Sequence, residues 1–135
     1  MSPADKQAID ALTAQFFGAF TTLGGGTPDV DRLYRLFLPQ ARIVNNVGAA
    51  SEVYDVATFV EPRRALLTGG VVREFVEEET SEKTDICGTI AQRFSRYRKR
   101  WEQLGETRSG DGTKSLQFVR TADGWRIASL IWDDD

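Results

Sequence analysis

The chain has 135 residues, of which 41% are hydrophobic and 27% charged, and its net charge is −3. That length and composition predict one domain, residues 1–135, with a sizeable core that needs no structural metal or disulfide. A mildly acidic chain has no general attraction for nucleic acid or anionic membranes, so we expect neither as a partner.

Histidine is absent from the chain. Its absence excludes Ser-His and Cys-His nucleophile pairs and removes both the commonest general base near neutral pH and the preferred ligand for zinc. The single cysteine, Cys87, excludes an intramolecular disulfide and fits a reducing compartment. No signal-like or membrane-spanning segment is found, so we expect a cytoplasmic protein.

The chain opens with two helical patterns. Ser2–Asp5 combines a capping serine, a proline suited to the first turn and an early acid, which predicts a helix start. Apolar residues then follow the helical period as far as Leu23, and the glycines at 24–26 end the helix. Thr27–Asp29 repeats the capping pattern and predicts a second, shorter helix that Pro39 ends.

A short strand and a third helix come next. Residues 41–46 alternate between two faces and predict the strand. Thr58–Glu61 resembles a capping box and predicts a helix that runs to about Leu67, with Pro62 tolerated in its first turn.

The second half of the chain follows a β pattern. One strand is expected over about 71–79 and a long one over about 86–101. The polar, glycine-containing segment 105–112 predicts a mobile loop, and the turn at 121–124 predicts a terminal hairpin. This order of elements predicts an α+β fold, with helices on one side of a curved sheet.

Two segments, Phe37–Val44 and Gly124–Trp132, resemble the nuclear transport factor 2-like superfamily, and most of all its SnoaL-like branch. The resemblance extends over nearly the whole chain. It implies a cystatin-like cone, in which a curved mixed or antiparallel sheet wraps around three N-terminal helices. The superfamily includes isomerases, cyclases, dehydratases, hydrolases and non-catalytic adaptors, so function has to be argued from the site.

The resemblance also indicates which catalytic residues are missing. The position of the isomerase base is occupied by Asn45, the oxyanion tyrosine by Phe16 and the protonated aspartate by Leu116. An amide cannot accept the proton, and the other two side chains have no hydroxyl or carboxyl group. The cyclases of the branch use an Asp–His pair, which this chain lacks. We therefore expect no catalytic residue of these known mechanisms, and no metal or cofactor.

Strand alternation predicts a largely apolar pocket inside the cone. If Leu116 faces inward, so does Phe118, and the last strand turns Ile127, Ser129, Ile131 and Asp133 inward as well. The expected ligand-binding residues are Phe16, Phe20, Tyr34, Asn45, Tyr97, Leu116, Phe118, Ser129, Ile131 and Asp133. The alternative is that these side chains fill the cone as core.

Asp133 is the one weak catalytic candidate. A carboxylate at the rim of an apolar cavity can have a raised pKa, and Tyr97 or Tyr34 could donate to a developing oxyanion. The alternative is that Asp133 belongs to a solvated acidic tail with Asp134 and Asp135, too frayed to hold a hard cation.

Two surfaces of the expected sheet have a distinctive composition. The basic cluster between Arg93 and Arg100 is expected to pair with the glutamates of the preceding strand rather than with nucleic acid. The outward face of the last hairpin predicts a homodimer interface. Its expected residues are Val119, Ala128, Leu130 and Trp132.

Three functions remain open from the sequence. The first is a homodimer that binds a small, largely apolar molecule in the cone. The second is an isomerase, dehydratase or hydrolase that uses Asp133 with a tyrosine and Asn45. The third is an interaction module that binds protein through its sheet.

Overall fold

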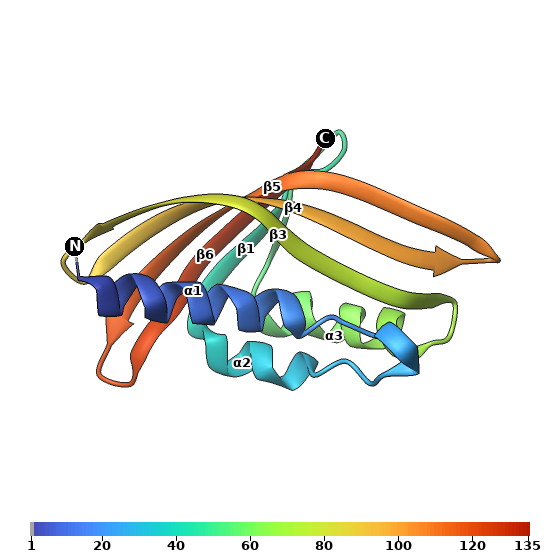
Figure 1. The fold of residues 1–135 in the computed structure, drawn as a ribbon, viewed down its shortest axis with the longest axis horizontal. Coiled ribbons are helices and arrows are strands. Elements are labelled where there is room, and N and C mark those ends of the chain that lie inside the picture. Colours follow the sequence, from blue (N-terminus) through green and yellow to red (C-terminus); the bar gives the residue numbers. More distant parts are fainter. Residues whose placement is uncertain (1) are drawn as a thin grey trace.

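The computed structural model describes residues 2–135, in which three α-helices pack against one face of a six-stranded sheet (Figure 1). The helices are α1 (Pro3–Gly18), α2 (Leu33–Leu36) and α3 (Val56–Thr68), with 3-10 turns at Leu23–Gly25 and Val30–Arg32. The strands are β1 (Phe37–Asn45), β2 (Glu52–Tyr54), β3 (Val72–Cys87), β4 (Ile90–Gln103), β5 (Glu106–Thr121) and β6 (Gly124–Asp134).

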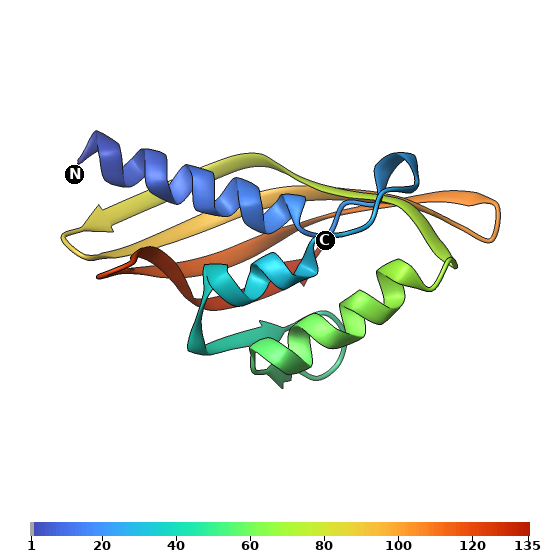
Figure 2. The ribbon, with the colours of Figure 1, turned by 90° about the horizontal axis from the view of Figure 1, so that it is seen from below.

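The sheet is curved and open, with the strand order β2-β1-β6-β5-β4-β3. β1 and β6 pair in parallel, and the other neighbouring strands are antiparallel. All three helices lie on the same side, and Figure 2 shows them in front of the sheet when the molecule is seen from below. The expected α+β architecture is therefore confirmed, with the edges β2 and β3 left unclosed.

The helices follow their sequence signals with three differences. The first helix ends at Gly18, before the end expected near Leu23, and Leu23–Gly25 form a separate 3-10 turn. α1 starts at Pro3 and buries Ile9, Leu12 and Phe16 as the period predicts. The second helix is shorter than expected, because β1 already begins at Phe37. The capping box of α3 is formed by Asp55 and Thr58 rather than by Thr58–Glu61, since the side chain of Asp55 accepts the backbone N–H of Thr58 at 2.9 Å.

Strands β3 and β5 are longer than the sequence pattern indicated, whereas β4 begins at Ile90 and not near Ile86, because Gly88 and Thr89 form the turn after β3. β3 continues to Cys87, because its polar second half is an edge strand with no need for a continuous apolar run. The segment 105–112 is not a mobile loop but the start of β5, paired with β4 in register from Glu106 onward. A side chain at Gly112 would collide with the Tyr97 hydroxyl, so this glycine marks a close approach and not a loop.

A β-bulge in β6 changes which residues face the helices. Phe118 pairs with Ile127 and Gln117 with Ser129, so Ala128 is an extra residue without a partner on β5. The alternation therefore reverses after Ile127. Leu130 and Trp132 are buried on the helix side, whereas Ile131 and Asp133 are exposed on the other.

The inward orientation expected for Ser129, Ile131 and Asp133 is consequently wrong, because a shift of one residue turns every later side chain to the opposite face. Asp134 replaces Asp133 on the inner side.

Across residues 2–135, none of the helices combines the length and apolar character required to cross a bilayer.

Candidate functional site

A cavity of about 400 Å³ lies between α1, α3 and the inner face of the sheet. Its walls are mainly aromatic. The rings belong to Phe16, Phe20, Phe59, Phe75, Tyr97, Trp101 and Trp132. Most of them meet edge to face, such as Phe59 and Trp132 with centroids 5.8 Å apart, which fixes the shape of the wall. A volume of this size is typical of small-molecule sites.

Lys114 places an ammonium group at the base of the cavity. The side chain is buried, and its Nζ lies 3.0 Å from Glu77 Oε1 and 4.0 Å from the centroid of the Tyr97 ring. Burial lowers the pKa of Lys114, and the facing carboxylate of Glu77 opposes that shift. The ion pair between Lys114 and Glu77 therefore adds little net charge to this part of the cavity.

Asp134 reaches the cavity from the end of β6. Its carboxylate accepts hydrogen bonds from the Tyr97 hydroxyl and from Lys99 Nζ, the latter at 2.9 Å. Partial burial by itself would raise the pKa of Asp134, but these two donors hold it below the ordinary value. The pKa of Tyr97 is raised by burial and by the adjacent carboxylate, so the hydroxyl keeps its proton.

Arg63 enters the cavity from α3. Its guanidinium carbon lies 4.0 Å from the centroid of the Phe59 ring and 5.2 Å from that of Trp132. One Nη1–H donates to the Phe59 carbonyl at 3.0 Å. Among residues 2–135, no carboxylate lies within ion-pair distance of Arg63, and burial lowers its pKa.

The structure brings together four of the expected ligand-binding residues. Phe16, Phe20, Asn45 and Tyr97 all line the cavity. The other six do not.

Those six lie in three environments. Leu116 and Phe118 are fully buried in the core behind the cavity wall. Tyr34 is exposed and donates to Glu61 at 2.5 Å. Ser129, Ile131 and Asp133 lie on the opposite face of the sheet because of the bulge.

Sequence reasoning missed the charged side chains of the site. Lys114 could have been found, since it shares the inward alternation of Leu116 two residues away. Asp134 could not, because no residue type marks Ala128 as a bulge. Arg63 and Glu77 belong to different elements, and only the packing of α3 over β3 brings them to one cavity.

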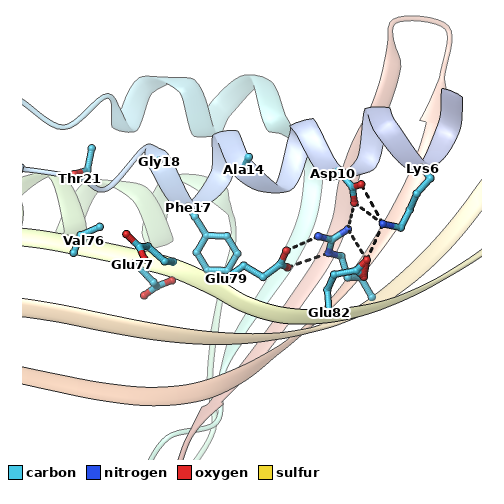
Figure 3. A pocket seen from close by; sticks show the side chains of 12 residues that line it. Lys6, Asp10, Ala14, Phe17, Gly18, Thr21, Val76, Glu77, Glu79 and Glu82 are labelled. Carbon is cyan, nitrogen blue, oxygen red and sulfur yellow. Dashed lines mark hydrogen bonds and ion pairs between the residues drawn. The ribbon is translucent and has the colours of Figure 1, made fainter. Parts of the chain in front are cut away.

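A larger groove of about 610 Å³ between α1 and β3 is a weaker candidate. Figure 3 shows Lys6, Asp10, Glu79 and Glu82 pointing toward one another, whereas Glu77 stands apart from them. Arg93 contacts Glu79 at 2.5 Å and Asp10 at 2.7 Å, and Lys6 contacts Glu82 at 2.7 Å. Because these groups satisfy one another, the groove is best explained as the joint between α1 and the sheet.

The expected dimer surface is also changed by the bulge. Leu130 and Trp132 are buried on the inner side, so they cannot meet a partner, while Val119 and Ala128 are half-buried. The outer face carries a different apolar row. It consists of Phe94, Ile131, Val44 and Val53, with Ser115 between the first two, all adjacent in the strand register.

No family model matches the sequence, and no curated protein matches it. Solved structures do match its fold. A protein from Kribbella flavida is 17% identical with a TM-score of 0.81, covering 98% of this chain and 91% of the other. A nuclear transport factor 2-like superfamily protein from Salmonella enterica is 14% identical with a TM-score of 0.79, covering 97% and 91%.

A third match has a printed fold description. It is a nuclear transport factor 2-like protein with a cystatin-like fold from Novosphingobium aromaticivorans, 18% identical with a TM-score of 0.72, covering 97% and 82%. Identities this low establish the fold and leave the activity open. With its open, curved sheet and three helices on one face, this chain has the fold of the nuclear transport factor 2-like superfamily.

Proposed function

We propose that the protein binds a small, largely apolar molecule in the cavity between α1, α3 and the sheet. The observation that supports this most is an aromatic wall around about 400 Å³ of space, with a few charged groups at fixed positions. A filled cone would have favoured an interaction module instead. Pockets of this composition bury a ligand on apolar surface and orient it with few polar contacts.

An enzyme that uses Asp134 is the second candidate. Asp134 and Tyr97 form a hydrogen-bonded pair inside the cavity, the arrangement that Asp133 was expected to provide. The pair is better suited to binding than to proton transfer. The lowered pKa of Asp134 makes it a weak base near neutrality, and the raised pKa of Tyr97 makes it a weak acid.

We also propose a homodimer formed through the outer row of Phe94, Ile131, Val44 and Val53. Phe94 is 61% exposed and Ile131 47% exposed, although both are large and apolar. A row of this kind across an open sheet is typical of a partner surface. We further propose that the chain belongs to the SnoaL-like branch, because its terminal hairpin resembles that branch. We also propose a cytoplasmic location, which the single free cysteine, Cys87, supports.

The cavity is tested with 2-naphthamide, a flat, neutral probe, by isothermal titration. Leu66→Trp places a bulky ring at the cavity wall, so we expect it to weaken binding about tenfold or more. Leu104→Trp is the matched control, because Leu104 lies on the exposed β4–β5 turn and should leave binding unchanged. Equal affinity of both variants would place the probe elsewhere and contradict the proposal.

A further inference from the structure

We propose that the ligand of this cavity is a flat aromatic monocarboxylate whose carboxylate is bound by Arg63. This inference rests on the proposed binding function and adds the chemical class of the ligand. Three independent observations support it: the geometry of the guanidinium, the balance of charge in the cavity and the composition of its wall.

The guanidinium of Arg63 is held in place with most of its donors free. Its carbon lies 4.0 Å from the centroid of the Phe59 ring and 5.2 Å from that of Trp132, and these two contacts restrict the side chain. Only the Nη1–H bond to the Phe59 carbonyl is made within residues 2–135. Of the five N–H donors of an arginine, the others can meet a ligand, and a carboxylate matches their fork with two parallel bonds.

The charges of the cavity leave one cation without a partner. Lys114 pairs with Glu77 at 3.0 Å, and Lys99 pairs with Asp134 at 2.9 Å. Arg63 is the third cation of the lining and has no such carboxylate in the described chain. Three cations and two anions give an excess of one positive charge, which a monoanion would neutralise. A cationic ligand would be repelled, and a dianion would bring one uncompensated charge into a poorly solvated site.

The remaining surface of the cavity suits an aromatic body. Seven of its lining side chains carry rings, which come from α1, the segment after it, α3 and three different strands. Rings arranged edge to face, such as Phe16 with Phe20 at 5.3 Å, favour a flat partner over a bulky aliphatic one. The carboxylate and the ring system of a single ligand would therefore contact Arg63 and the aromatic wall at the same time.

The test compares 2-naphthoate with its neutral isostere 2-naphthamide by isothermal titration at neutral pH. We expect the unmodified protein to prefer the carboxylate. Arg63→Met keeps the aliphatic part of the side chain but removes the charge, and we expect it to weaken naphthoate binding about ten- to a hundredfold while naphthamide changes less than about twofold. Arg63→Lys keeps the charge without the fork and should recover only part of the loss.

Arg64→Met is the matched control. Arg64 is the next residue of α3 but pairs outside the cavity with Asp31 at 2.5 Å and Glu61 at 2.9 Å, so its removal should leave both affinities unchanged. Far-UV circular dichroism of each variant verifies that it is folded. If Arg63→Met does not fold, the comparison of Arg63→Lys with Arg64→Lys decides.

The outcomes separate this inference from the proposed function. Equal binding of naphthoate and naphthamide, or an equal loss of both in Arg63→Met, would overturn the role of Arg63 and leave cavity binding intact. Tighter binding of 2-naphthyl phosphate than of naphthoate would overturn the monocarboxylate. Binding of neither naphthoate nor naphthamide would overturn the proposed function itself.

Discussion

The buried arginine Arg93 is stabilised by several polar partners at once. Arg93 is only 3% exposed, and both Nε and Nη2 contact the carboxylate of Glu79, at 3.1 and 2.5 Å. Burial by itself would lower the pKa of Arg93, but Glu79 and Asp10 hold it above the ordinary value. Ser95 donates a further bond to Glu79 at 2.6 Å. This cluster joins α1 to β3 and β4 at one edge of the sheet.

We expect Arg93→Met to lower the free energy of unfolding by about 3 kcal/mol, because it leaves Glu79 and Asp10 without their shared cation. Arg98→Met is the control. Arg98 is 67% exposed and, within residues 2–135, pairs only with Asp111, so its loss should cost less than about 0.5 kcal/mol. Urea unfolding measures both values. Equal losses would mean that the buried cluster contributes no more than a surface pair.

The elements are positioned by small irregularities in their backbone. The extra residue Ala128 lets β6 place Ile127, Leu130 and Trp132 on one face, which regular alternation could not do. Gly112 performs a related task in β5, since its missing side chain leaves room for the Tyr97 hydroxyl at the cavity. The position of Asp134 in the site follows from the first of these irregularities.

Deletion of Ala128 and deletion of Ile131 each shorten β6 by one residue, but we expect them to lower the free energy of unfolding by different amounts. Without Ala128 the strand becomes regular and the same side chains still face inward, so we expect a loss of less than about 2 kcal/mol. Without Ile131, Trp132 turns outward and its place in the core is left open, which should cost more than about 3 kcal/mol. The urea midpoints of the two proteins measure this difference, and similar midpoints would show that β6 has no fixed register.

The whole molecule has two faces of different character. The inner face of the sheet holds the helices and the cavity, and the outer face is free of helices along its length (Figures 1 and 2). A shared outer face would leave both cavities of a dimer accessible, because they open on the opposite side. Binding of a ligand and association of two chains would then be independent properties of one fold.

We expect the protein to sediment as a dimer at micromolar concentration, and Phe94→Glu and Ile131→Glu to convert it to a monomer. A buried carboxylate in each copy would face an apolar partner surface. Leu104 is 81% exposed and lies on the β4–β5 turn, outside the outer row, so Leu104→Glu should remain dimeric. Trp132→Glu should unfold the protein instead of dissociating it, since Trp132 is buried inside. A monomeric unmodified protein would contradict the interface.

Local signals in the sequence predicted the elements well where a residue type has a fixed conformational role. Pro3 at the start of α1 and the turn around Gly124 are examples. The sequence signals were weaker for segments whose conformation depends on pairing with a neighbouring strand. The polar half of β3 and the glycine-containing start of β5 form strands only because each pairs with β4 along its length.

The amino-acid sequence by itself determined the fold class, the absence of histidine chemistry and a largely apolar inner surface, because these depend on composition and on regular periods. Only the tertiary structure decided which charged groups share the cavity. Arg63, Lys114 and Asp134 come from a helix and two strands, and one unpaired residue, Ala128, decides whether Asp133 or Asp134 is inside. The alternating pattern of the sequence does not reveal such a one-residue shift, because the shift arises only when the strand pairs with its neighbours.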